Sequence, residues 1–92
     1  MDNAKPVQVS LDDQERARLR WQCRRGMREL DELLQPFVRR YLDVISAREL
    51  QVLRQLLACP DQHLLAYLML HETPEDQGWV DVINRIRICA AD

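Results

Sequence analysis

Apolar residues return at steps of three and four along most of this chain, which is the spacing of one face of an α-helix. The clearest run lies between residues 27 and 41. Its apolar positions are Met27, Leu30, Leu34, Phe37 and Tyr41, joined by Leu33 and Val38. Pro36 lies inside this run, and because proline has no backbone N–H, we expect it to kink or break the helix near residues 32–36.

The N-terminal part of the chain predicts a tail followed by a helix. Residues 1–9 show no apolar period and contain Pro6, so we expect them to form a flexible tail. Ser10 can cap a helix over about residues 11–25, in which acidic side chains occupy the first turn. Gly26 fits the position just after this helix, where a positive φ is usually needed.

Start and stop signals predict three further helices. Ser46 and Glu49 have the spacing of a capping box, and a leucine-rich stripe follows them. Asp61 comes directly after a proline and is expected to cap the next helix. Thr73 followed by Pro74 is a typical start for the last one. Five short helices with short connections indicate an all-α protein.

The composition indicates one soluble domain. The chain has 92 residues, of which 47% are apolar and 30% charged, and this balance argues against disorder. We therefore expect a compact five-helix single domain over residues 10–92. No apolar run approaches the length of about 18 residues that crosses a bilayer, so membrane insertion is not expected.

Arginine is concentrated in one segment near the N-terminus. Six of the thirteen residues from 16 to 28 are arginine and none is acidic, although the whole chain has a net charge of −2. The six are Arg16, Arg18, Arg20, Arg24, Arg25 and Arg28. A solvated helix face is the simplest interpretation of such a cluster.

The spacing within this segment also suggests a docking surface. Four polar positions follow one another at steps of four, three and four, namely Arg18, Gln22, Arg25 and Glu29. If the backbone does not swing far at Gly26, they share one face with Trp21 nearby, and such a patch suits docking on a partner protein. Two simpler roles stay open: Gly26 as a helix stop, and Glu29 as a cap of the second helix.

Residues that usually catalyse reactions or bind metals are scattered along the chain. Cys23, Cys59 and Cys89 form no CxxC pair, and together with the lack of a signal peptide they indicate a reducing cytoplasm. His63 and His71 do not have the spacing of metal ligands. No nucleophile–base pair and no glycine-rich loop can be located. We therefore expect no enzyme activity and no metal site.

Nucleic acid is another partner that clustered arginines could bind. The two helices expected around Pro60 could imitate a helix-turn-helix. The second of them, about residues 62–71, contains no Arg or Lys, whereas docking in a groove needs positive charge against the phosphates. A nucleic acid partner is therefore not expected.

The segment from Arg25 to Glu29, RGMRE, resembles the RGxxE signature of the SdhE family, the bacterial succinate dehydrogenase flavinylation factors. The likeness covers about residues 16–88. Besides the signature it includes Arg18 and Trp21, Pro36 and Phe37, the leucines Leu53, Leu56 and Leu57, the stretch from Leu68 to His71, and Pro74. RGxxE alone is a weak pattern, but it is specific in this order within a short helical chain.

The resemblance implies a five-helix domain with no active site of its own. Members of this family promote covalent attachment of FAD to the flavoprotein subunit of succinate dehydrogenase, and in bacteria also of fumarate reductase. FAD then belongs to the partner, whose own histidine forms the bond. By the same resemblance, Arg25, Gly26 and Glu29 form the core of the docking surface. Arg18 matches a further contact position, and we include its neighbour Trp21 and the signature residue Arg28.

The family also suggests a second role of a different class. Some members were proposed as antitoxins that pair with a small membrane-associated toxin. A neighbouring gene for a short membrane protein would favour this alternative. It would not exclude the role in flavinylation.

Overall fold

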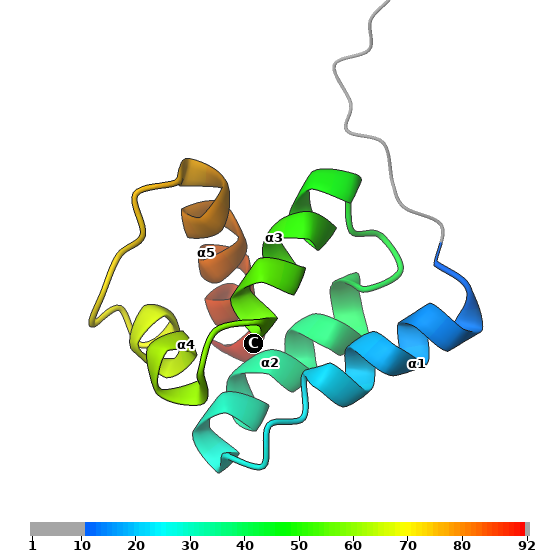
Figure 1. The fold of residues 1–92 in the computed structure, drawn as a ribbon, viewed down its shortest axis with the longest axis horizontal. Helices are drawn as coiled ribbons and strands as arrows, with labels where there is room; N and C mark the ends of the chain where they lie inside the picture. The colour runs from blue at the N-terminus through cyan, green and yellow to red at the C-terminus, as the bar shows by residue number, and fades with distance from the viewer. Residues whose placement is uncertain (1–10, 92) are drawn as a thin grey trace, which may run out of the picture.

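The structure is a computed structural model that describes residues 11–91, which contain five α-helices (Figure 1). They are α1 (Asp13–Gln22), α2 (Arg28–Tyr41), α3 (Ala47–Leu57), α4 (Asp61–Leu68) and α5 (Gln77–Ala91). Residues 11–91 contain no β-strand, and the prediction of a compact all-α fold is confirmed. The tail expected at residues 1–9 and the expected cap Ser10 lie outside the described residues.

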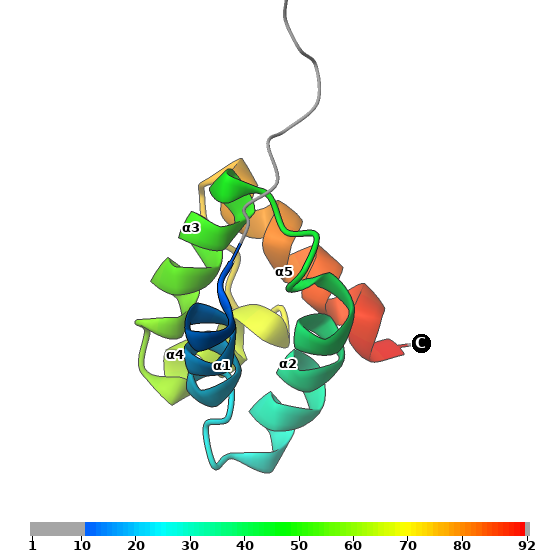
Figure 2. The ribbon, with the colours of Figure 1, turned by 90° about the vertical axis from the view of Figure 1, so that its right-hand side faces the viewer.

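The packing centres on α2 and α5, which contact each other more extensively than other pairs of helices do. Figure 2 shows these two helices on one side of the molecule and α1 and α3 on the other. α3 also packs along α5, and α4 contacts both α2 and α5. The connection between α1 and α2 lies at one end of this arrangement, at the lower edge of the molecule in Figure 1.

The apolar stripe of α2 forms the middle of the core, as its spacing predicts. Leu30, Leu34 and Phe37 are at most 1% exposed. They belong to one core cluster with buried residues of α3 and α5, among them Leu53, Leu56, Ile83 and Ile86. Pro36 was expected to kink or break the helix; α2 continues through the proline to Tyr41, so the break is absent, and the kink stays a prediction. Burial of the apolar residues before and after Pro36 outweighs the free-energy cost of a proline inside a helix, which is about 3 kcal/mol.

α1 begins and ends at other residues than the sequence signals indicated. Its cap is Asp12, whose Oδ1 accepts the Glu15 N–H at 2.7 Å within a capping box. The helix ends at Gln22, whereas the prediction extended it to residue 25. The backbone N–H of Arg25 donates instead to the carboxylate of Asp31 at 2.8 Å. A local side-chain acceptor thus replaces the helical one, and the chain leaves the helix early.

The capping box predicted for α3 is confirmed. Ser46 Oγ accepts the Glu49 N–H, and Glu49 Oε1 accepts the Ser46 N–H, both at 3.1 Å. The start of α4 is shifted by one position, because Pro60 is the N-cap residue and Asp61 is already the first helical residue. The Asp61 carboxylate does not cap α4 and accepts a hydrogen bond from Arg25 instead.

α5 begins later than predicted. Its first residue is Gln77, whereas Thr73 and Pro74 were expected to start it. The Trp79 N–H donates to Asp76 Oδ1 at 3.2 Å, which is the bond of an N-cap residue. Thr73 and Pro74 therefore belong to the loop between α4 and α5.

The three cysteines differ in exposure, and we predict that they differ in reactivity. Cys23 is 0% and Cys89 2% exposed, whereas Cys59 is partly exposed. Burial raises the pKa of the Cys23 thiol to about 12, although the nearby charge of Arg25 acts in the opposite direction. Because the thiolate is the reactive species, Cys59 should be the one thiol of the native protein that reacts quickly with DTNB at about pH 8. The fast phase should vanish in Cys59→Ser, and its survival there would contradict this assignment.

Candidate docking surface around the α1–α2 connection

Residues 23–27, which connect α1 to α2, form the candidate docking loop (Figure 1). Gly26 has a φ of +75°, so the positive φ expected at this glycine is confirmed. A Cβ atom added to Gly26 would meet no atom within 4 Å. The glycine is therefore required by the backbone conformation and not by close packing inside the protein. The space beside it is open, so a partner can approach the backbone here.

Four of the predicted docking residues are exposed side chains on the two helices beside the docking loop. Arg18 and Trp21 lie on α1, and Trp21 is 75% exposed. Arg28 and Glu29 lie in the first turn of α2, where Arg28 Nε pairs with Glu32 at 3.2 Å. Glu29 makes no hydrogen bond or ion pair within residues 11–91, and α2 has no side-chain cap. The structure therefore does not support a capping role for Glu29.

Arg25 is held by the protein itself, and only 17% of its side chain is exposed. Its Nε donates to Asp61 Oδ1 at 2.9 Å. Its Nη1 donates to the Gln22 carbonyl at 3.0 Å, and its Nη2 to the Cys59 carbonyl at 3.2 Å. These bonds tie the docking loop to the end of α1 and to the turn between α3 and α4.

The four polar residues do not lie on one continuous helix, because α1 ends at Gln22 and α2 begins at Arg28. Arg18 and Gln22 lie on α1, Arg25 lies in the docking loop, and Glu29 lies on α2. The surface is therefore assembled from two helices and a turn. Direct contact between Arg25 and a partner stays a prediction.

Three residues that sequence reasoning missed hold the docking loop in place. Asp31 accepts the backbone N–H of Arg25, and Asp61 accepts its side chain. Gln35 Nε2 donates to the Cys23 carbonyl at 3.2 Å. Asp31 and Gln35 come from α2 and could have been suspected as neighbours of the loop. Asp61 is 36 residues from Arg25, and no local pattern indicates that pairing.

Two hollows flank the docking loop. The first, of about 530 Å³, lies along the start of α2, and its lining includes Gly26, Arg28, Asp31, Glu32, Pro36 and Arg39. The second, of about 280 Å³, lies where α1 and α3 end, and it is lined by Gln22, Arg25, Arg54, Leu57 and Ala58. The lining of the second contains two guanidinium groups and no carboxylate. The guanidinium of Arg25 is already paired with Asp61, so an acidic group of a partner would complement Arg54.

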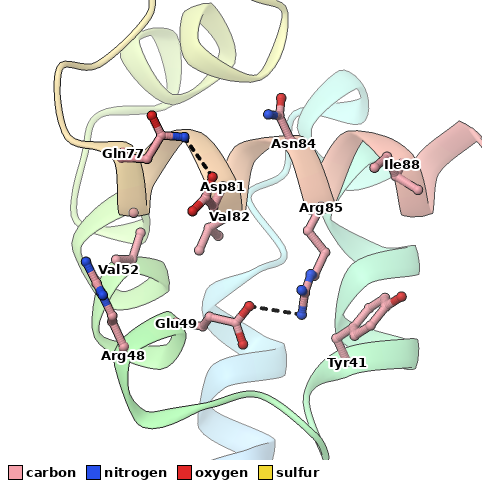
Figure 3. A pocket seen from close by; sticks show the side chains of 11 residues that line it. Tyr41, Arg48, Glu49, Val52, Gln77, Asp81, Val82, Asn84, Arg85 and Ile88 are labelled. Atoms are coloured by element: carbon pink, nitrogen blue, oxygen red, sulfur yellow. Dashed lines mark hydrogen bonds and ion pairs between the residues drawn. The ribbon is translucent and has the colours of Figure 1, made fainter. Parts of the chain in front are cut away.

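A hollow of about 640 Å³ lies away from the docking loop, between α2, α3 and α5 (Figure 3). Arg85 of α5 reaches toward Glu49 of α3, with 2.9 Å between Nη1 and Oε2 (Figure 3). The same guanidinium lies 5.1 Å from the centre of the Tyr41 ring. Gln77 Nε2 donates to Asp81 Oδ1 at 2.8 Å. The lining contains no histidine, cysteine or serine, and we assign no chemistry to it.

The two histidines do not form a metal site with other side chains of the described range. His63 Nε2 lies 3.0 Å from Glu72 Oε1, and its ring stacks on Tyr67 with 4.6 Å between the centroids. Within residues 11–91, no group of three or more His, Cys, Asp or Glu side chains is placed to hold a metal ion. None of the helices in this range has the length and apolar character needed to cross a membrane.

Comparison with known proteins assigns this chain to a family. The family described as flavinator of succinate dehydrogenase matches residues 17–90, which include the whole docking loop. A relative from Legionella pneumophila (strain Paris), named FAD assembly factor SdhE, is 42% identical over 79 residues, which are 86% of this chain and 99% of the relative. Proteins of the same name from Idiomarina loihiensis and Photorhabdus laumondii are 43% and 40% identical over 76% and 84% of this chain, and over 78% and 88% of their own lengths. The chain therefore belongs to the family of succinate dehydrogenase flavinators.

Proposed function

We propose that this protein is an FAD assembly factor, which binds the flavoprotein subunit of succinate dehydrogenase and promotes covalent attachment of FAD to it. The observation that carries the proposal is the match of residues 17–90 to the flavinator family. The relatives named FAD assembly factor SdhE support it. The flavoprotein of fumarate reductase is a second acceptor in this proposal. The relatives' names give no support to the antitoxin alternative.

In this proposal the chain acts by binding its partner and not by catalysing the reaction. The flavoprotein holds FAD and supplies the atoms of the new bond, so this chain needs no cofactor or metal, and it works in the cytoplasm. What it offers is a surface that surrounds an exposed glycine with polar and aromatic side chains. Trp21 is suited to be an anchor of that interface, because exposed tryptophan and arginine are common among residues that dominate binding energy.

Glu29 is the second anchor we propose, because it is exposed and has no partner within residues 11–91. We predict that Glu29→Ala leaves the fold intact, since an exposed acid in a first helical turn contributes at most about 1 kcal/mol. Loss of one member of a charged pair buried at an interface costs roughly 2–5 kcal/mol, so the affinity for the flavoprotein should fall about 30-fold or more. The measurements are binding to the purified flavoprotein and thermal melting of each variant.

The cellular test is covalent FAD on the succinate dehydrogenase subunit, scored by in-gel flavin fluorescence in cells that lack the native factor. Wild-type protein should restore the fluorescent band, and Glu29→Ala should not. Glu75→Ala is the matched control, because Glu75 is also exposed and lies in the loop before α5. Full restoration by Glu29→Ala would remove Glu29 from the surface. Failure of the wild-type protein to bind the flavoprotein would overturn the proposed function.

A further inference from the structure

We propose that Asp61 is a positioning residue, which holds the docking loop in its binding geometry through Arg25. The inference rests on the proposed function, because only a partner gives the loop geometry a functional meaning. Asp61 lies in the first turn of α4, 36 residues from Arg25 in the sequence. Its role is to order the surface that the partner meets and not to meet the partner itself.

The geometry around Arg25 is that of a clasp with three acceptors. Two of them are backbone carbonyls, at Gln22 and Cys59, which lie at or just after the ends of α1 and α3. Helix C-termini carry partial negative charge, so an arginine placed between two of them is stabilised. Asp61 is the only anionic acceptor of the three, and charge-assisted bonds are the stronger ones.

The burial of this pair separates it from ordinary surface ion pairs. The side chain of Arg25 is 17% exposed and that of Asp61 is 36% exposed. By contrast, the Arg28–Glu32 pair on the neighbouring turn is 88% and 66% exposed. Solvent therefore screens the clasp less than it screens the pairs on the open surface. The backbone of Arg25 is fixed as well as its side chain, because its N–H donates to the carboxylate of Asp31.

The docking loop needs such a clasp because it contains a glycine with free space around it. Gly26 can adopt several backbone conformations, and neither a helix nor packing at its Cβ position restricts it. The apparent affinity of a loop for its partner falls in proportion to the fraction of time that it spends in the binding conformation. A side chain that restrains Arg25, directly before Gly26, raises that fraction.

The first test is Asp61→Asn, which keeps the shape of the side chain and removes its charge. We expect the amides of Arg24 and Arg25 to lose protection from hydrogen exchange by about 5- to 10-fold, and the affinity for the flavoprotein to fall by about the same factor. Glu49→Gln is the matched control, because it weakens the Arg85–Glu49 pair, also 2.9 Å long but far from the loop. It should change neither quantity. Unchanged protection in Asp61→Asn would overturn the proposal.

The second test is a double-mutant cycle on affinity with Arg25→Ala, Asp61→Asn and the double variant. If Asp61 acts through Arg25, the double variant binds as weakly as Arg25→Ala alone. Additive losses would mean that the two residues act independently, and the proposal would be wrong. Hydrogen exchange needs no partner, so it separates the two proposals. If the wild-type chain fails to bind the flavoprotein, the proposed function is contradicted. If Asp61→Asn still increases hydrogen exchange in the docking loop, the role of Asp61 in holding the loop is supported.

Discussion

Gly26→Arg should abolish covalent flavinylation while leaving the five-helix fold in place. At a φ of +75° every residue with a Cβ atom is strained by about 1–2 kcal/mol, which disturbs the docking loop. The new side chain would also project into the open space beside the loop, where we expect the partner backbone. The two effects together should weaken the complex by more than about 100-fold. The readout is in-gel flavin fluorescence, with binding to the purified flavoprotein measured in parallel.

Gly26→Ala separates the two causes of that loss. An alanine Cβ meets no atom within 4 Å inside the protein, so this change adds strain with almost no bulk. Its affinity should therefore lie between those of wild type and Gly26→Arg. Thermal melting should show that both variants fold. Normal flavinylation with Gly26→Arg would show that the partner does not approach this part of the loop.

Phe37→Ala should destabilise the domain by about 3–5 kcal/mol, because the ring is fully enclosed at 1% exposure. The cavity would open in the α2 stripe beside Tyr41, whose ring stacks on Phe37 with 5.8 Å between the centroids. Small domains are stable by only about 5–15 kcal/mol, so this loss is a large part of the total. Urea unfolding measures it directly, and the melting temperature should fall by at least about 12 °C.

Trp21→Ala is the matched control for the loss of an aromatic ring. Trp21 is larger than Phe37 but 75% exposed, so its removal should cost less than about 1 kcal/mol of stability. In the proposed complex it should instead weaken binding to the flavoprotein. A cost under about 1 kcal/mol for Phe37→Ala would show that the apolar stripe of α2 does not form the centre of the core.

Sequence reasoning succeeded where a signal is repeated or chemically unique. The stripe of α2 has five apolar positions in register, and Gly26 is one of only two glycines in the chain. It failed at the starts of α1 and α5, where several residues compete for the same role. Ser10 and Asp12 are both good caps at the start of α1, and Thr73 and Asp76 at the start of α5. Tertiary packing chooses between such neighbours, and the sequence alone does not reveal the choice.

The sequence predicted which residues belong to the candidate surface, but not how the structure orients them. The signature residues were found from their order along the chain, whereas their orientation depends on where α1 ends. α1 ends at Gln22, and the N–H of Arg25 donates to Asp31 of α2 instead of to a helical carbonyl. The inward direction of the Arg25 side chain depends on Asp61, and a contact over 36 residues leaves no periodic trace in the sequence.

In the proposed role of Asp61, the docking loop is held in its binding geometry only after residue 61 has been translated. The docking loop leaves the ribosome before α3 and α4 do, so at that stage Arg25 has no Asp61 to pair with. The central packing of α2 against α5 forms only after α5 has been translated. Local helices form within about a microsecond, whereas translation adds about 5–20 residues per second. A nascent chain that displays residues 25–29 but has not yet reached Asp61 therefore presents a docking loop that the proposed ion pair does not yet hold.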